Sequence, residues 1–493
     1  MTNNSFLDGL INETNKKLTE NGANAYGSSL DSLIDFFALM GAMRGRSTDD
    51  IYALFEKAYA EDALLALKAL FYLRNIRGGL GERDTARRIL ARAANEHTAD
   101  ILVNFENIAK FGRLDDFYAF VGTNLEKYAL DFLKELYLKD LGYLEANEPE
   151  KISLVGKWLK SCNTSSKESR ALGRLTAKAF GESEASYRKH LSALRKALNL
   201  VEVKMSNKEW GTIDYEKLPS LAALKYKAAF SRNDEERYNK FLEAVAQGKA
   251  KINSATLYPY DLVKSYLGTW GYNGKVDTTV EEQWKALPNY VTEDKDFLIM
   301  ADVSGSMSGR PMQTSVGLAI YFAERNKGLY HNKFMTFSEK PSIIELPEGA
   351  SLASKVNVTA IAPWGFNTDL ERAFDTILKA AIASKCSQKE LPEALVVITD
   401  MEIDSFGGDD FETITEKMEK KFASAGYKLP TLVWWNVAAR QNTFHATASD
   451  NVRFISGQSA AAFKGLCENI GSSPRDLMLG ILNDPAYESV RLA

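Results

Sequence analysis

Apolar side chains recur at intervals of three and four residues through most of the first half of the chain, the spacing of one helix face. Stop signals such as the glycines near Arg77 and Gly112 separate the segments. Many short helices with short connections indicate an α-solenoid of stacked helical hairpins, although no strict sequence period is present. We predict helices at 32–40, 51–59, 64–73, 85–94, 101–109, 125–138, 167–180 and 186–198. Residues 241–290 are less regular and are interpreted as a connection.

The pattern changes at Asp296, where short apolar runs begin to alternate with amphipathic segments. Such alternation predicts an α/β fold with a doubly wound parallel sheet, whose ligands bind at the carboxyl ends of the strands. The expected strands are 297–301, 334–337, 394–399 and 432–437, and the expected helices are 311–326, 370–383 and 413–425. The chain therefore divides into an arm (1–28), an all-α region (29–290, with a linker from about 241) and an α/β domain (291–493).

Composition indicates the class of protein and the compartment in which we expect this multidomain chain. Its 493 residues are 45% hydrophobic and 26% charged, as in ordinary globular proteins. The first 30 residues have no basic region followed by an apolar run, and no stretch approaches the roughly 18 apolar residues of a membrane span. Three widely spaced cysteines are typical of reduced thiols, so we expect a cytoplasmic protein with no membrane partner.

Polar loops follow or precede the predicted elements of the α/β domain at three places. Asp302, Ser304 and Ser306 come directly after the first strand, Thr368 lies in the loop 365–369 before a helix, and Asp400 ends a later strand. Oxygen ligands of this kind suit a hard cation, so we expect Mg²⁺ or another divalent ion such as Mn²⁺ or Ca²⁺. The serines would ligate directly, Thr368 directly or through water, and the two aspartates mainly through water. Two carboxylates leave the ion incompletely neutralised and attractive to an acidic group of a partner.

These loops also admit other interpretations. Asp302 could cap a helix while the serines form turns, or the ion could only stiffen the domain. A haloacid-dehalogenase-type phosphatase needs a second aspartate where this chain has Ser304. A phosphate loop is missing from the sequence, Met307 occupies the nucleophile position of the one glycine-flanked elbow, and the four histidines are scattered. The sequence thus contains no catalytic constellation, and we do not expect an enzyme.

The three loops resemble the metal-ion-dependent adhesion site of von Willebrand factor A domains. All five ligand types of that site occur in order, at Asp302, Ser304, Ser306, Thr368 and Asp400. One departure is Met401, which follows Asp400 where many such domains place glycine.

Charge is unevenly distributed over this chain of net charge −4. Residues 151–240 carry 19 basic and 10 acidic side chains, whereas residues 1–150 carry 17 basic and 24 acidic ones. Basic residues recur at helical spacing on two successive predicted helices, which could form one patch for phosphates. They are Lys167, Arg170, Arg174, Lys178, Arg188, Lys189, Arg195 and Lys196. The alternative is an ordinary solvated helix face.

Several segments of the helical half resemble TROVE domains of Ro autoantigen-type RNA-binding proteins. They are Tyr72–Gly79 with Gly81–Asp84, Ala109–Asp116, Tyr187–Leu191 and Leu218–Ser220. The order of domains agrees as well, and the whole chain resembles an uncharacterised Ro-like family. The resemblance implies helices curled into a ring that the A domain closes, with single-stranded RNA ends inside and structured small RNAs outside. Whether this ring closes is left open by the sequence. Arg74, Arg77 and Arg83 could instead order the turn at Gly78–Gly81.

The sequence is compatible with two functions. The first is a non-catalytic RNA-binding protein whose metal site recruits an acidic partner, with Trp158, Tyr187 and Trp210 available for base stacking or for the core. The second is a metal-dependent protein-interaction scaffold without RNA.

Overall fold

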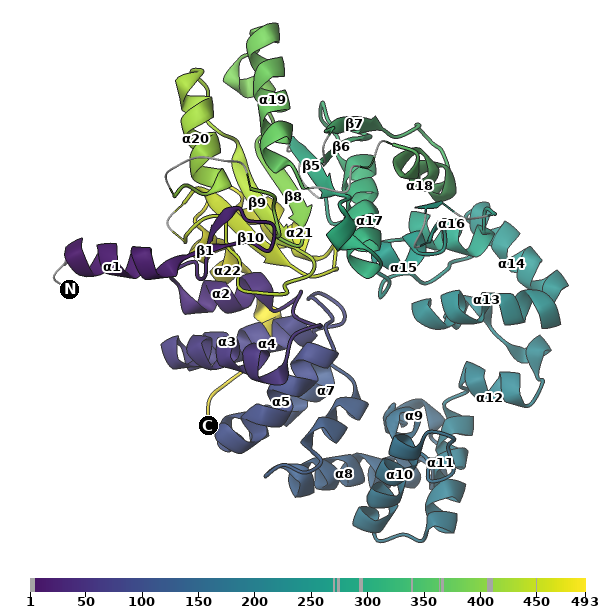
Figure 1. The fold of residues 1–493 in the computed structure, drawn as a ribbon. Helices are drawn as coiled ribbons and strands as arrows, with labels where there is room; N and C mark the ends of the chain where they lie inside the picture. Colours follow the sequence, from purple (N-terminus) through teal and green to yellow (C-terminus); the bar gives the residue numbers. More distant parts are fainter. Residues whose placement is uncertain are drawn as a thin grey trace.

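The structure is a computed structural model that describes residues 5–268, 271–272, 275–291, 296–337, 340–362, 364, 368–405, 411–448 and 450–493. It consists of a curved arc of helices whose two ends both pack on one α/β domain (Figure 1). The predicted order, a helical region followed by a doubly wound α/β domain, is confirmed. None of the described helices is long and apolar enough to cross a membrane. Cys162, Cys386 and Cys467 form no disulfide.

An N-terminal helix and hairpin precede the arc: α1 (Ser5–Asn15), β1 (Lys16–Leu18) and β2 (Asn24–Tyr26). Side-chain caps fix the start of many arc helices, as at Asp31, Ser47 and Asp62, whose oxygens accept backbone N–H groups of the first turn. The helix expected at 101–109 is broken into two at Val103–Asn104. The helices of the first part of the arc are α2 (Ser32–Leu39), α3 (Thr48–Glu61), α4 (Ala63–Arg74), α5 (Asp84–Glu96), α6 (Thr98–Leu102), α7 (Phe105–Phe111), the 3₁₀ helix η1 (Leu114–Phe120) and α8 (Glu126–Glu145).

The second part of the arc carries the basic helices and then returns to the α/β domain. The stretch interpreted as a connection contains the end of α14 and two further helices, so it continues the helical packing. These elements are α9 (Val155–Trp158), α10 (Lys167–Phe180), α11 (Glu184–Ala197), α12 (Val201–Ser206), α13 (Ser220–Asn233), α14 (Glu235–Ala246), α15 (Pro259–Val263) and α16 (Thr278–Lys285), with the short strands β3 (Leu267–Gly268) and β4 (Gly271–Tyr272).

A buried ion-pair cluster explains the glycine- and arginine-rich segments of the first part. Asp116 is fully buried and accepts hydrogen bonds from Arg74 Nε at 2.7 Å and Arg87 Nε at 2.6 Å. A Cβ at Gly112 would lie 2.2 Å from the Asp116 carboxylate, so only glycine lets this carboxylate approach. Arg77 donates to the carbonyl of Lys110. Arg74 and Arg77 therefore join neighbouring helices.

The α/β domain contains a six-stranded sheet of order β10-β9-β8-β5-β6-β7, parallel except for the edge strand β7. The strands expected from the sequence match β5 (Phe297–Asp302), β6 (Lys333–Phe337), β8 (Ala394–Thr399) and β9 (Thr431–Asn436). Both edge strands, β7 (Ser342–Glu345) and β10 (Val452–Ser456), escaped prediction. The helices are α17 (Arg310–Arg325), α18 (Leu352–Ala360), α19 (Leu370–Ser384), α20 (Ile414–Ser424), α21 (Ala462–Asn469) and α22 (Pro474–Leu482).

The first joint between arc and sheet is formed by α2, which packs on β10. Gly41 N–H donates to Ser456 Oγ at 3.0 Å, and Ala439 N–H donates to the carbonyl of Ala42 at 3.0 Å. A Cβ at Gly41 would lie 2.7 Å from the Ser456 carbonyl oxygen and 2.9 Å from Gly457 Cα. The two backbones thus meet without an intervening side chain.

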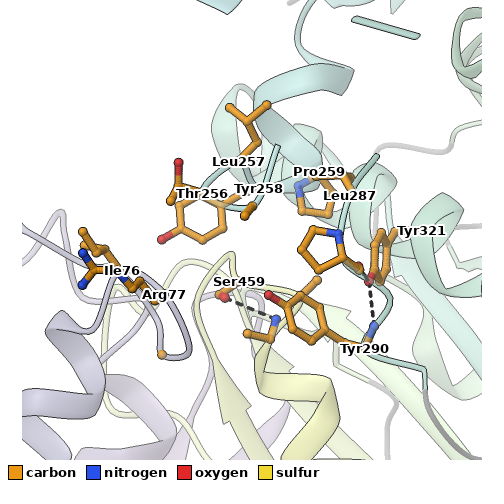
Figure 2. Close-up of a pocket in the computed structure, with 15 residues that line it drawn as sticks. Ile76, Arg77, Thr256, Leu257, Tyr258, Pro259, Leu287, Tyr290, Tyr321 and Ser459 are labelled. Carbon is orange, nitrogen blue, oxygen red and sulfur yellow. Dashed lines mark hydrogen bonds between the residues drawn. The ribbon is translucent and has the colours of Figure 1, made fainter. Parts of the chain in front are cut away.

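The second joint is formed by α15, which packs on α17, where Gly317 allows the backbone of Pro259 to approach. A cavity of about 20 Å³, room for about one water, lies between the two parts of the arc and the α/β domain (Figure 2). Its lining includes Arg77 from the first part of the arc, Tyr258 and Pro259 from the second, and Ser459 from the α/β domain. The arc therefore returns to the domain from which it started.

Replacing Gly41 by alanine should break the first joint. The added methyl group overlaps main-chain atoms of β10 that cannot rotate away, so we expect a loss of about 1–3 kcal/mol in the free energy of unfolding. Gly45→Ala is the matched control because a Cβ there meets no atom within 4 Å. Thermal unfolding of both variants checks this. Equal stability of the two variants would contradict the assigned joint.

Candidate metal centre

The carboxyl ends of β5 and β8 bring the two predicted aspartates to one edge of the sheet. The strands are parallel neighbours, with Ala301 beside Ile398. Asp302 is the last residue of β5, and Asp400 follows the last residue of β8. Both side chains are buried. The sheet register therefore places two buried carboxylates where ligands of such folds bind.

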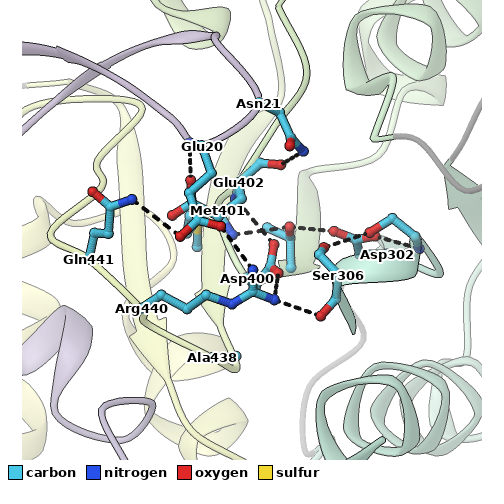
Figure 3. Close-up of polar contacts among 12 residues, drawn as sticks. Glu20, Asn21, Asp302, Ser306, Asp400, Met401, Glu402, Ala438, Arg440 and Gln441 are labelled. Atoms are coloured by element: carbon cyan, nitrogen blue, oxygen red, sulfur yellow. Dashed lines mark hydrogen bonds and ion pairs between the residues drawn. The ribbon is translucent and has the colours of Figure 1, made fainter. Parts of the chain in front are cut away.

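Short-range hydrogen bonds fix the loop that follows β5 (Figure 3). Asp302 Oδ1 accepts the Ser304 N–H at 2.9 Å, and Oδ2 accepts the Thr399 hydroxyl at 2.6 Å. The Ser304 and Ser306 hydroxyl oxygens lie 3.1 Å apart. Asp400 Oδ1 accepts the Glu402 N–H at 3.2 Å. Asp302, Ser304, Ser306 and Asp400 are thus brought together around one point.

Thr368 is buried at the edge of the neighbouring loop. Its N–H donates to Asp404 Oδ2 at 2.7 Å, and the Asp404 N–H donates to the Thr368 carbonyl at 3.3 Å. This pairing ties Thr368 to the loop that follows Asp400. Residues 365–367 of the same predicted loop lie outside the described part of the chain.

Burial disfavours the charged form of both carboxylates. Burial, and then the neighbouring Asp400, raise the pKa of Asp302 to about 7, against hydrogen bonds from Thr399 and Ser304 that lower it. Burial also raises the pKa of Asp400, while a hydrogen bond from Ser306 lowers it. Among the described residues no three His, Cys, Asp or Glu side chains cluster as a metal site. A cation here would be held by two carboxylates and hydroxyl oxygens, a donor set that suits Mg²⁺.

Met401, at the position where many adhesion sites have glycine, keeps a backbone conformation typical of glycine. Its backbone φ is +70°, a left-handed conformation that glycine adopts without strain. Two contacts hold it: the Met401 N–H donates to Thr399 Oγ1 at 3.2 Å, and His445 Nε2 donates to the Met401 carbonyl at 3.0 Å. Burial lowers the pKa of His445 to about 4, so its ring is neutral at physiological pH.

Sequence reasoning missed two charged residues at this site. Arg440, in the loop after β9, lies 3.2 Å from Asp400 Oδ2 and donates to the Ser306 carbonyl at 2.7 Å. Glu20, in the turn of the N-terminal hairpin, lies 3.0 Å from Arg440. Arg440 could have been suspected, since it follows the carboxyl end of a parallel strand. Nothing local in the sequence places Glu20 here.

The basic residues predicted for RNA lie on α10 and α11, which contact one another. Arg174 Nε on α10 pairs with Glu184 Oε1 on α11 at 3.2 Å, so an ion pair joins the two helices that carry the basic stripes. Arg195 is different, because its guanidinium donates to the Gly156 and Leu159 carbonyls and to Ser161 Oγ. Arg170 is half-buried, and the exposed residues are Lys167, Arg174, Lys178, Arg188, Lys189 and Lys196.

Two family models match this chain, and both are described as domains of unknown function. DUF2828 matches residues 19–121 and 173–295, and DUF7788 matches residues 296–475. The "Uncharacterized protein L728" of Acanthamoeba polyphaga mimivirus is 30% identical over 506 residues, covering 95% of this chain and 87% of that protein. This chain belongs to the same family as the mimivirus protein.

A solved structure also matches over both parts of the chain. The crystal structure of the RO (RSR) protein of Deinococcus radiodurans covers 92% of this chain and 99% of its own, at a TM-score of 0.46 and 16% sequence identity.

A divalent cation should stabilise the protein more at pH 8 than at pH 6. Without metal, Asp302 has a higher pKa in the folded than in the unfolded protein, so protonation of its carboxyl favours the folded state. This contribution to the free energy of unfolding is fully present below about pH 4 and is lost as the pH rises through about 7. A bound cation offsets the two negative charges above pH 7. We therefore expect millimolar Mg²⁺ or Mn²⁺ to raise the unfolding temperature mainly at the higher pH.

Asp302→Asn should remove this metal effect. Asp375→Asn, which breaks an ion pair between α19 and Lys421 of α20, should retain it. Equal metal-dependent shifts in the wild type and in Asp302→Asn would exclude the site.

Proposed function

We propose that this chain is a non-catalytic RNA-binding protein whose α/β domain also holds a Mg²⁺ site for an acidic ligand. The observation that carries the RNA part is the joined basic surface of α10 and α11 on a chain that is acidic elsewhere. The resemblance of the helical half to TROVE segments supports the same assignment.

The chemistry of this surface suits phosphates. Six lysines and arginines on the two helices are exposed, and within the described residues only Arg174 among them forms an ion pair, with Glu184 at 3.2 Å. Mobile cationic side chains of this kind bind a polyanion by displacing its counterions. Trp158 adds an aromatic group nearby, and its ring stacks with the Arg113 guanidinium at 4.1 Å. Tyr187 is fully buried in the core, so it offers no face for a base.

The metal part of the proposal rests on the buried carboxylate pair. Asp302, Ser304, Ser306 and Asp400 would hold the ion, and Thr368 would approach it from the neighbouring loop. A bound Mg²⁺ supplies a positive charge that an acidic side chain or a phosphate can ligate. In this proposal the hydroxyl groups around the site serve as oxygen ligands, and we propose no reaction there.

A metal-dependent scaffold without RNA is the second candidate. The observation in its favour is that α10 and α11 lie in the part of the arc far from the α/β domain, so the two sites could act independently (Figure 1). In that case charge reversal on α10 and α11 would leave function intact, whereas Asp302→Ala would abolish partner binding.

RNA should co-purify with the native protein and depend on the basic surface. Protein purified without nuclease is digested with RNase, and the protected RNA is sequenced. We expect defined RNA with the wild type and its loss from the variant R174E/K178E/R188E/K189E. Binding of the recovered RNA should weaken on the order of 100-fold at physiological salt.

The control variant is K379E/K385E/K389E/K428E, which makes the same change in net charge on exposed lysines of the α/β domain. It should keep the RNA. No protected RNA from a folded wild type, or equal loss from both quadruple variants, would reject RNA binding at α10 and α11.

A further inference from the structure

Arg440 occupies the outer side of the candidate metal site (Figure 3). Its Nη2 contacts two groups of the site at once, Asp400 Oδ2 at 3.2 Å and the Ser306 carbonyl oxygen at 2.7 Å. The Asp400 side chain has no exposed surface, whereas 40% of the Arg440 side chain is exposed. The guanidinium therefore reaches from solvent onto the buried carboxylate.

The same guanidinium has a second acidic partner at the rim. Arg440 Nη1 lies 3.0 Å from Glu20 Oε2, and Gln441 Nε2 donates to Glu20 Oε1 at 3.3 Å. Glu20 does not depend on Arg440 for its position. Its N–H donates to Glu402 Oε2 at 2.6 Å, and Thr19 Oγ1 donates to the Ile403 carbonyl at 2.7 Å.

A divalent ion and this guanidinium cannot share Asp400 without repulsion. Both are positive, both would lie within a few ångströms of the same oxygen, and burial weakens the screening between them. Glu20 offers the guanidinium another carboxylate that it already contacts. The side chain can thus leave Asp400 and remain paired with Glu20.

We propose that Arg440 is a built-in cation that competes with the divalent ion for Asp400 and so sets the affinity of the metal site, while Glu20 holds the displaced guanidinium. This inference rests on the metal site of the proposed function and adds the residues that regulate it. The loop around Arg440 is held by contacts that do not involve the guanidinium. Replacing Arg440 should therefore change the charge at the site and leave the loop in place. Asn442 accepts a hydrogen bond from Arg46 at 2.7 Å through its side chain and one from Lys17 at 2.8 Å through its carbonyl.

The test is calorimetric titration of the full chain with Mn²⁺ and with Mg²⁺. Arg440→Gln should bind either ion about tenfold more tightly than the wild type, since it removes one positive charge beside the ion. Arg440→Lys keeps the charge and should bind like the wild type. Arg475→Gln is the matched control, since Arg475 also pairs with two carboxylates, Asp31 and Glu61, away from the metal site. It should leave metal affinity unchanged.

Glu20 is tested by a double-mutant cycle. Glu20→Gln should weaken metal binding in the wild-type background and have little effect in Arg440→Gln, because its proposed role acts through Arg440. An equal effect in both backgrounds would overturn the role of Glu20.

The titration distinguishes failure of the Arg440 competition from failure of the metal site. Unchanged or weaker metal binding in a folded Arg440→Gln, with metal bound by the wild type, overturns the competition and leaves the metal site standing. Binding by Arg440→Gln alone supports the competition most strongly. If neither binds Mn²⁺ or Mg²⁺, the metal site fails and the inference fails with it.

Discussion

The helical arc joins the α/β domain through a backbone contact at Gly41, and most of the architecture follows from that contact. Gly41 lies against Ser456 and Gly457, which ends β10 with a backbone φ of +97°. The approach lets one hydrophobic core run from α2 through the sheet, including Phe37 and Trp435. That core continues through α11, and among the described residues the lobe containing α12 to α14 forms a separate core. Rotation of the arc against the sheet would therefore expose apolar surface on both sides.

Both chain ends reinforce this joint from outside. The N-terminal hairpin pairs with the α/β domain through Tyr26 and Phe444, whose backbones exchange hydrogen bonds of 2.8 and 3.0 Å. The C-terminal segment returns to the arc, where Asn107 Nδ2 donates to the Ser489 carbonyl at 2.9 Å. These contacts bring the turn at Glu20 and the loop at Arg440 to the carboxyl edge of the sheet. The metal edge is thus built by three distant parts of the chain.

Charge divides the molecule into two surfaces with different chemistry. At the metal edge, burial raises the pKa of both Asp302 and Asp400, the charge of Asp400 raises that of Asp302 further, and the Arg440 guanidinium offsets part of the negative charge. At α10 and α11, exposed cationic groups outnumber carboxylates and stay in solvent. The first surface suits a small cation and the second suits a polyanion. Helices α10 and α11 lie far from the α/β domain (Figure 1), so direct electrostatic coupling between the two surfaces is screened by solvent and salt.

Local sequence determined the helical character of the first half, the four inner strands of the sheet and the position of Asp302 and Asp400 at strand ends. Each of these follows from periodicity or from strand order, which are local properties. The edge strands escaped because neither has a clear apolar run: β7 is a four-residue strand that is mostly not buried, and Arg453 interrupts the apolar residues of β10. Tertiary structure alone decided that Arg195 binds carbonyl groups rather than facing solvent. It also decided that Glu20 and Arg440 meet at Asp400, because their contact spans 420 positions of the chain and depends on the packing between hairpin, arc and sheet.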